Sequence, residues 1–441
     1  MTDQAPGTEA DLRHAVDTAR QLAGRGGEAD LSQALAVLDT ALETSASYMP
    51  ALLLRSRLRA RAGNMAGAVQ DAATAMTAEP GNADANALLS EHMQAVGRLD
   101  EAALFAYEAL KAAPEDPERF VALAGILRDQ GSFEAAEELL AAAGTLAPDD
   151  VDIVLSRMDC LMRLDRETEA VRCGEAALER FGDDVRILRN QGNALRQAGR
   201  REEAAAAFER ILHLTPGDGY ARHLLATLNG SAPDTADPEY VKAVFDAASG
   251  SFDESMMERL QCRVPGLIAA AVGRHLPGGG LAVLDIGCGT GLSGVLLRER
   301  AAFLKGIDLS PGMVEVAHLK NLYDELEVAE ITAALATEPR RFDLVVAGEL
   351  MPYFGNAEPL MHAVKACLKP RGWCILSMEL NLEDGPFVLN SSGRFAHSRD
   401  EVRRVASACG FAIAQMEEQN LRLQAGQPVA GLVVALQSLD G

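Results

Sequence analysis

A 34-residue period runs through the first half of the chain and restricts its fold more than any other feature. Five positions follow this period: Pro80, Pro114, Pro148, Gly182 and Pro216. A fixed period of this length is typical of repeat architectures, because each repeat is one supersecondary unit stacked on the next. The sequence therefore predicts an all-α solenoid over residues 15–230, with about six helix-turn-helix units and a capping helix at 219–228.

Small residues follow the same period inside each unit. A turn between two helices is indicated at Gly63, Gly97, Gly131 and Gly199, with Asp165 as the exception. Two alanines, seven residues apart, recur on the second helix: Ala34, Ala68, Ala102, Ala136, Ala170 and Ala204, then Ala41, Ala75, Ala109, Ala143 and Ala177, with Ile211 breaking the series. Such small side chains let helices approach closely.

The period and its small residues resemble the tetratricopeptide repeat. That resemblance implies a groove that docks a protein or peptide. A structural role and homodimerisation are the alternatives.

The period stops at "NGSAPDTADPEY" (229–240), which is rich in turn-forming residues and predicts a domain boundary. We expect an N-terminal tail over 1–14, a linker and helical lid over 231–276, and an α/β domain over 277–441. Seven apolar segments alternate there with helical patterns, as in a largely parallel sheet. The last two have no helix between them and predict an antiparallel pair at one edge.

Composition narrows the class of protein. The 441 residues carry a net charge of −23, and both halves are acidic, which argues against a nucleic-acid partner. The N-terminal sequence has no signal-peptide pattern, and no apolar run is long enough to span a membrane. Seven cysteines without a C-x-x-C pair indicate reduced thiols, no zinc site and a cytoplasmic protein.

The stretch "VLDIGCGTGLSG" (283–294) predicts a cofactor loop, because an apolar strand ends in an acid and is followed by glycines at every second position. A dinucleotide fingerprint would place its third small residue at Leu292, which is too large. An acid at 285 suits the cationic amino group of S-adenosylmethionine better than a pyrophosphate. Asp308 ends the next strand and is placed to accept both ribose hydroxyls, a contact that NAD would also make.

The acid Asp285, the glycine spacing after it and the second acid Asp308 together resemble the pattern of the class I S-adenosylmethionine-dependent methyltransferases. These enzymes have a Rossmann-like seven-stranded sheet. The segments "FDLVVAGELMPYFGN" (342–356) and "LKPRGWCILSME" (368–379) are similar to the fourth and fifth strands of that family, with Arg371 where its first glycine is usual. The chain as a whole is similar to a bacterial group of predicted methyltransferases that carry tetratricopeptide repeats.

The resemblance implies the following cofactor-binding residues: Asp285, Gly287, Cys288, Gly289, Gly291, Asp308, Leu309, Met313, Glu330, Ile331, Glu349, Phe252 and Arg263. Asp285 would orient the amino group, and Leu309 and Met313 would pack on the adenine. Phe252 and Arg263 belong to the expected lid. An ordinary surface glutamate is the alternative at 330.

Methyl transfer requires a base only where the acceptor loses a proton. The candidate catalytic residues are His397, on a Gly- and Ser-rich loop, with Glu349 and Tyr353 after the fourth strand. Structural roles are the alternatives for His397 and for the aromatic residues Tyr353 and Tyr323. The predicted function is a methyltransferase with an undefined acceptor, either a small molecule or a protein. A repeat scaffold that binds the cofactor without turnover is the alternative.

Overall fold

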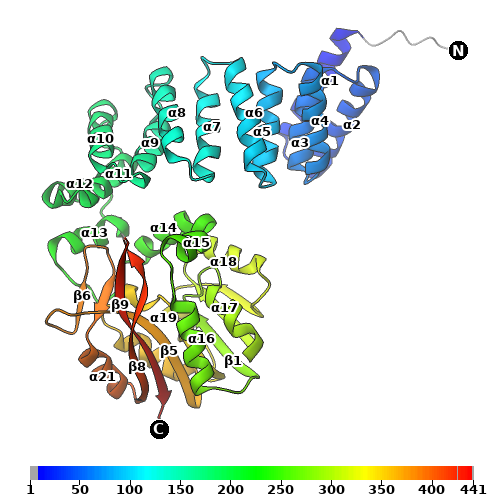
Figure 1. Cartoon of the computed structure of the whole chain (residues 1–441). Coiled ribbons are helices and arrows are strands. Elements are labelled where there is room, and N and C mark those ends of the chain that lie inside the picture. Colours follow the sequence, from blue (N-terminus) through cyan, green and yellow to red (C-terminus); the bar gives the residue numbers. More distant parts are fainter. Residues whose placement is uncertain (1–7, 425, 440–441) are drawn as a thin grey trace. The chain divides into compact units, whose positions relative to one another are not determined.

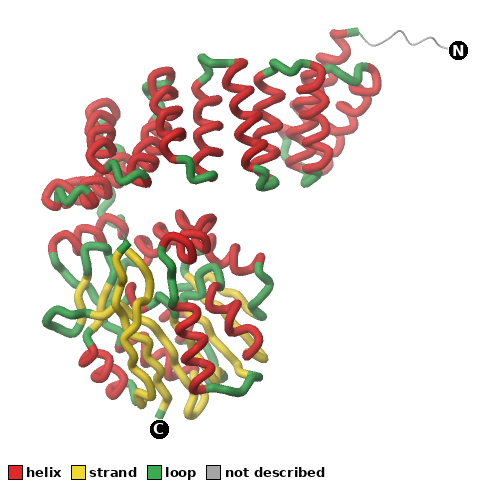
Figure 2. Tube along the Cα trace, viewed as in Figure 1, coloured by secondary structure: helices red, strands yellow, loops and turns green. Residues whose placement is uncertain are grey.

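The structure is a computed structural model that describes residues 8–424 and 426–439. Its contacts divide the chain into two compact units, Met1–Arg200 and Arg201–Gly441, and each is described separately. The first seven residues of the predicted tail lie outside the described range. Figure 2 shows helices only in the first unit, and helices with a sheet in the second.

The first unit is a row of helices joined by short turns (Figure 1). Its helices are α1 (Glu9–Gly24), α2 (Glu28–Thr44), α3 (Met49–Arg61), α4 (Met65–Ala78), α5 (Ala83–Ala95), α6 (Leu99–Ala112), α7 (Pro117–Asp129), α8 (Phe133–Leu146), α9 (Val151–Arg163), α10 (Glu167–Phe181) and α11 (Val185–Gln197). Its helices pair in the predicted 34-residue units, and α12 (Arg201–Leu214), in the second unit, completes the sixth pair in sequence.

The backbone explains the small residues of the period. The turn glycines have φ of +79°, +76° and +74° at Gly63, Gly131 and Gly199, a region that side chains with a Cβ disfavour. Ala68, Ala136 and all their equivalents eighteen residues into each unit are fully buried. The predicted solenoid is thereby confirmed.

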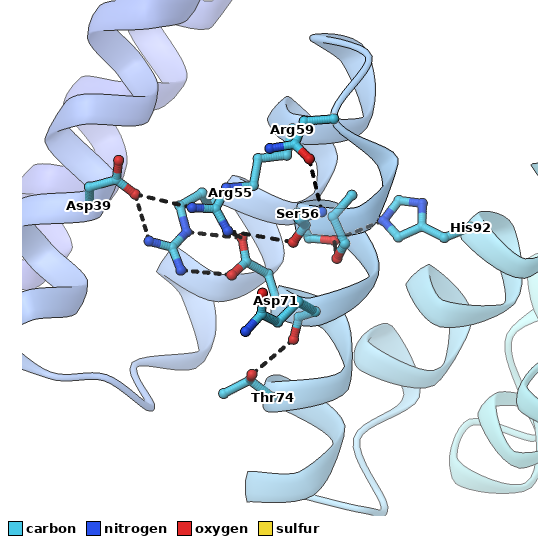
Figure 3. A network of polar contacts seen from close by, with 11 residues as sticks. Asp39, Arg55, Ser56, Arg59, Asp71, Thr74 and His92 are labelled. Atoms are coloured by element: carbon cyan, nitrogen blue, oxygen red, sulfur yellow. Dashed lines mark hydrogen bonds and ion pairs between the residues drawn. The ribbon is translucent and has the colours of Figure 1, made fainter.

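A network of ion pairs joins three helices of the first unit (Figure 3). The Asp71 carboxylate on α4 accepts hydrogen bonds from Arg55 on α3 at 2.7 and 2.9 Å and from Arg59 at 2.9 Å. Arg55 also donates to Asp39 on α2 at 2.6 Å. Asp71 is only 2% exposed, so the arginines satisfy a buried charge and fix α3 against α4.

The second unit begins with two helices that the period assigns to the solenoid, α12 and α13 (Gly219–Asn229). His223 on α13 is buried, stacks on Tyr240 with ring centroids 4.1 Å apart, and its Nε2 lies 3.0 Å from the Gly393 carbonyl. This contact fixes α13 to the α/β part of the same unit. The predicted domain limits remain predictions.

The remaining helices surround the sheet. They are α14 (Pro238–Ala248), η1 (Ser249–Ser251), α15 (Phe252–Glu254), η2 (Ser255–Arg259), α16 (Val264–His275), α17 (Leu292–Leu297), η3 (Arg298–Arg300), α18 (Pro311–Leu319), α19 (Ile331–Leu335), η4 (Met351–Tyr353), α20 (Glu358–Cys367) and α21 (Arg399–Ala408). Ile268 and Val272 of α16 pack on Val283, Leu344 and Ile375, which form one face of the sheet core. Among the described residues, no helix has the length and apolarity needed to cross a bilayer.

Within the described residues, the sheet has nine strands. They are β1 (Leu281–Ile286), β2 (Ala301–Asp308), β3 (Glu325–Val328), β4 (Phe342–Ala347), β5 (Leu368–Leu380), β6 (Phe387–Leu389), β7 (Phe395–His397), β8 (Phe411–Gln424) and β9 (Gln427–Ser438). The order is β3-β2-β1-β4-β5-β7-β6, and strands β1 to β5 are parallel. The β8–β9 pair is antiparallel, as predicted, and β9 closes on β5.

The short β6–β7 hairpin is absent from the seven predicted strands, because three-residue strands carry no alternation that a sequence pattern detects. Glu379 of β5 pairs with Gly431 of β9 on one side and with Ala396 of β7 on the other. β4 also pairs with β5 on the edge that faces away from β9, so β4 and β7 lie one after the other along the same edge of β5. The residues just after β4 therefore lie close to those just before β7.

Candidate functional site

The glycine loop leaves β1 in a conformation that requires glycine. Gly287, Gly289 and Gly291 have φ of +68°, +54° and +88°. The amides of Gly287 and Cys288 donate to the Ile307 carbonyl at 2.8 and 3.1 Å, which fixes the loop to the end of β2. A Cβ built at Gly289 would meet only Phe252 of the facing helix, at 4.0 Å. The loop thus leaves room for a ligand against its backbone.

Asp308 lies at the end of β2 and is bound to the glycine loop. Its Oδ2 accepts from the Gly289 amide at 2.8 Å and its Oδ1 from the Ser310 amide at 2.9 Å. Burial raises the pKa of Asp308, and the two amide donors oppose that rise. Asp308 also lines the cavity described below.

Asp285 lies beneath the loop, 1% exposed, and does not line the cavity. Its Oδ2 accepts a 2.8 Å hydrogen bond from the Tyr323 hydroxyl. Burial raises the pKa of Asp285 to about 7, and the Tyr323 hydrogen bond opposes the rise. Tyr323 also fills the space under Gly291 and Gly294, whose Cβ atoms would come within 3.0 and 2.4 Å of it. Tyr323 therefore supports the loop and does not line the cavity.

A cavity of about 370 Å³ lies over the carboxyl ends of β1 to β4. It brings together ten of the predicted residues: Phe252, Gly287, Cys288, Gly289, Asp308, Leu309, Glu330, Ile331, Glu349 and Tyr353. Its size is at the small end of the roughly 300–1,000 Å³ typical of ligand sites. Among the described residues, the charged side chains that line it are Asp308, Glu330 and Glu349. A cavity with acidic charges only suits a cationic cofactor.

Glu330 lines the cavity, but its carboxylate is hydrogen-bonded to backbone amides two and three residues further along the chain. Its oxygens accept from the amides of Thr332 and Ala333 at 3.0 and 2.8 Å, so it caps α19. This contact is enough to account for the acid at this position.

Glu349 stands just after β4 with an unusual backbone φ of +60°. Its carboxylate accepts hydrogen bonds from Arg394 and, at 3.1 Å, from Arg422. Both arginines also donate to Oε1 of the buried Glu379 at 2.6 Å. Burial would raise the pKa of Glu379, but Arg394 and Arg422 outweigh it and lower that pKa below its ordinary value. Tyr353 accepts from Arg394 at 3.0 Å, so four charges and one phenol form a single network.

The segment 238–260, here called the lid, forms one wall of the cavity through Val241, Phe245, Phe252 and Met256. Two acidic residues of the lid form hydrogen bonds with the glycine loop and with residues that follow β2. Asp246 accepts from the Ser310 hydroxyl at 2.5 Å. Asp253 accepts from the Thr290 hydroxyl and from Lys320, the latter at 2.5 Å. The segment just before the lid, residues 230–237, is here called the strap. It reaches the same wall, where the Ala236 amide donates to the Tyr353 carbonyl at 2.8 Å.

Five predicted residues lie outside the cavity lining: Arg263, Asp285, Gly291, Met313 and His397. Arg263 is exposed, and Met313 is fully buried in the first turn of α18. His397 is 1% exposed, and its Nε2 lies 3.1 Å from the Gly355 carbonyl. Burial lowers the pKa of His397. A buried neutral ring bonded to the backbone gives no support to its predicted role as general base.

The sequence did not predict two groups of residues at this site. Arg394 and Arg422 hold Glu349 from outside the cavity, and the strap residues Thr235 and Ala236 line it. "GRF" at 393–395 and "LRL" at 421–423 look like ordinary strand borders. For Arg422 the one available signal was its place between two leucines in a strand, since such a charge is rarely buried unpaired.

The comparisons with known proteins agree with this geometry. Residues 283–372 match the family model described as "Methyltransferase domain", and residues 161–219 match "Tetratricopeptide repeat". The ubiquinone biosynthesis O-methyltransferase of Ralstonia nicotianae is 30% identical over 171 residues, which are 35% of this chain and 71% of that protein. The same enzyme of Leptothrix cholodnii is 38% identical over 103 residues, 22% of this chain and 44% of that protein.

The chain spans about half the length of the first curated relatives it matches. Among solved structures, 1,6-didemethyltoxoflavin-N1-methyltransferase of Burkholderia thailandensis, with S-adenosylhomocysteine bound, is 19% identical and covers 48% of this chain and 93% of its own, with a TM-score of 0.38. The curated relatives and the two matched models, with the sheet and its glycine loop, place the chain in the family of class I S-adenosylmethionine-dependent methyltransferases, with tetratricopeptide repeats in its N-terminal part.

Proposed function

We propose that the chain transfers a methyl group from S-adenosylmethionine to an acceptor bound in the cavity of the second unit. One observation carries this proposal. A strand-end carboxylate, Asp308, is bonded to the amide of Gly289 at the rim of a cavity whose charged lining, among the described residues, is acidic only. That combination favours a ligand with a diol and a positive charge.

The residues fit the cofactor in a definite division of roles. The backbone of Gly287 and Gly289 would contact it, Asp308 would hold the ribose, and Leu309 with Ile331 would offer apolar contact to the base. Asp285 would act from beneath the loop by placing negative charge near the amino group. When bound, S-adenosylmethionine would supply an electrophilic methyl group to a lone pair of the acceptor.

The chain contributes positioning and exclusion of water. The lid covers the cavity through Phe245 and Phe252, and its two acids bond to Ser310 and Thr290 beside the cofactor loop. In-line displacement depends mainly on such positioning. Glu349 and Tyr353 line the cavity after β4, and they are the residues we expect nearest to the acceptor.

Calorimetry with S-adenosylhomocysteine tests the binding step. We expect a single site, no binding of NAD, and at least a tenfold loss of affinity in Asp308→Ala, because the ribose would lose a charged hydrogen-bond partner. Asp384→Ala, in an exposed loop, is the matched control and should bind normally. Binding of NAD in place of the homocysteine compound would reject the proposal.

For the solenoid we propose docking of a protein or peptide partner, with dimerisation of the chain as the alternative outcome. Cell lysate incubated with radiolabelled S-adenosylmethionine identifies the acceptor. Full-length chain and a chain lacking residues 1–200 are compared. Loss of labelling in the shortened chain supports recruitment by the solenoid. Equal labelling by both rejects it, and cofactor binding without any labelling supports the scaffold hypothesis.

A further inference from the structure

The strand order divides the cavity into two halves. Asp308 ends β2 and Glu330 comes just after β3, whereas Glu349 comes just after β4, which lies on the other side of β1. The glycine loop follows β1 and separates them. If the proposed function holds, the β2–β3 half receives the cofactor, and the β4 half is left for the acceptor.

The β4 half has apolar walls. Val241, Phe245 and Met256 come from the lid, and Leu350, Tyr353 and Phe354 follow Glu349. The rings of Phe245 and Tyr353 meet edge to face with centroids 5.4 Å apart. These side chains suit an apolar body, and they provide little compensation for burying a charge.

Glu349 is the charged side chain that this half presents among the described residues. Asp308 and Glu330 accept hydrogen bonds from backbone amides, whereas Glu349 is held by side chains from outside the lining. Arg394 and Arg422 are absent from the lining and are shared with Glu379. A ligand in the cavity therefore meets a carboxylate first and the guanidinium groups behind it.

The polar groups of this half specify one kind of partner. An ionised carboxylate is only an acceptor, so Glu349 requires an N–H or O–H donor. Tyr353 accepts from Arg394, and its own hydroxyl hydrogen can still be donated. An anionic ligand would place like charges together in an apolar site, which is unfavourable.

We propose that the methyl acceptor is an apolar, uncharged or cationic molecule that donates an N–H or O–H to Glu349, and that the cavity rejects carboxylates. This inference rests on the proposed function, because it assigns the cofactor to the other half. The proposed ligand of the β4 half is a small molecule that donates a hydrogen bond.

Three matched probes test the inference on the full chain saturated with S-adenosylhomocysteine: 4-butylphenol, 4-butylbenzylamine and 4-butylbenzoate. At pH 7.5 they are neutral, cationic and anionic. We expect the phenol or the amine to bind at least tenfold more tightly than the benzoate by calorimetry. Equal or tighter binding of the benzoate, or no saturable binding of any probe, overturns the inference. If S-adenosylhomocysteine itself does not bind, the proposed function is rejected instead.

A charge-removing variant identifies the group responsible. Glu349→Gln keeps the shape and should reduce the preference for amine over benzoate about tenfold. Glu418→Gln, which removes an exposed acid that pairs with Arg399 on the surface, is the control and should keep the preference. An unchanged preference in Glu349→Gln rejects Glu349 as the recognition group. If that variant does not fold, the probe series on the natural chain still decides the inference.

Discussion

Asp165 has a left-handed backbone, with φ of +54°, at the turn between α9 and α10. Four equivalent turns use glycine there. Arg371 is another non-glycine residue with a left-handed backbone, with φ of +61° at the site where the family usually has glycine. A side chain with a Cβ costs about 1–2 kcal/mol in this region, less for aspartate. Asp165→Gly should therefore raise the free energy of unfolding by about 0.5–1 kcal/mol.

Denaturant unfolding of the full chain measures this effect. Asp165→Ala removes the carboxylate but keeps the Cβ, so it should give no gain. A stabilised alanine variant would show that charge, and not backbone strain, is the cause.

Asp285 predicts a pH dependence of cofactor binding. Burial raises its pKa to about 7, so part of the free protein holds a proton there at neutral pH. A cationic amino group favours the ionised form, and binding should release that proton. We expect the affinity for S-adenosylmethionine to rise about fivefold between pH 6 and 7, about tenfold in all between pH 6 and 8, and to level off above pH 8.

Calorimetry in buffers of different ionisation enthalpy measures the proton release directly. Asp285→Asn should bind more weakly and lose the proton release. The same variant should unfold less readily than the natural chain at pH 8, by about 2–4 kcal/mol, because an acid whose pKa is raised in the folded state destabilises the fold as pH rises. The gain should shrink to below about 1 kcal/mol near pH 4 and disappear below about pH 3, where Asp285 is protonated in both states.

Between elements, the buried ion pairs of the solenoid give a sharp contrast. Asp71 is 2% exposed and bonds Arg55 and Arg59, whereas Asp39 bonds the same arginines with its side chain half exposed. Loss of a buried partner leaves charges uncompensated, while loss of an exposed one costs little. Asp71→Ala should lower the free energy of unfolding by about 2–4 kcal/mol, and Asp39→Ala by less than about 1 kcal/mol. Similar losses in both variants would contradict this reading of the network.

The lid depends on Asp253, which joins α15 to Thr290 of the glycine loop and to Lys320. Asp253→Ala should speed hydrogen exchange across residues 238–260 and weaken S-adenosylhomocysteine binding about five- to tenfold. Global stability should change by less than about 1 kcal/mol, because the pair is partly exposed. Glu254→Ala, at the exposed neighbouring position, is the control and should behave like the natural chain. Unaltered exchange in Asp253→Ala would remove Asp253 as the residue that holds the lid closed.

Local sequence patterns predict helices, strands and turns, but they do not predict which distant side chains come into contact. The period of Pro80 and the glycine spacing after Asp285 are visible because each depends on neighbours within one unit or one turn. The Glu349 network depends on residues 45 and 73 positions away, Arg394 and Arg422, which β7 and β8 bring together. His397 looked like a base because its loop is polar, but the β6–β7 hairpin buries it, and that hairpin has no sequence signature.

For the whole chain, the period predicts where the repeats end, and the contacts decide which unit each helix belongs to. α12 and α13 continue the repeat pattern in sequence, yet they belong to the compact unit that holds the cavity. An α-helix with an apolar stripe must bury that stripe against a surface of another element. In α13 that surface includes Tyr240, against which His223 is stacked.

This assignment predicts the outcome of two truncations. A chain that begins at Arg201 keeps the complete second unit and should bind S-adenosylhomocysteine within about twofold of the full chain. A chain that begins at residue 231 loses α13 and with it the bond from His223 to Gly393 and the ring contact with Tyr240. Losing a buried hydrogen bond and an aromatic contact should cost about 2–3 kcal/mol of stability.

Thermal unfolding and calorimetry of the two shortened chains test this directly. The longer one should unfold in a single cooperative transition at the higher temperature. His223→Ala in the chain that begins at Arg201 should reproduce part of the loss seen on removal of residues 201–230. If both truncated chains unfold at the same temperature and bind equally well, α13 belongs with the repeats in energetic terms, and the cavity is complete without it.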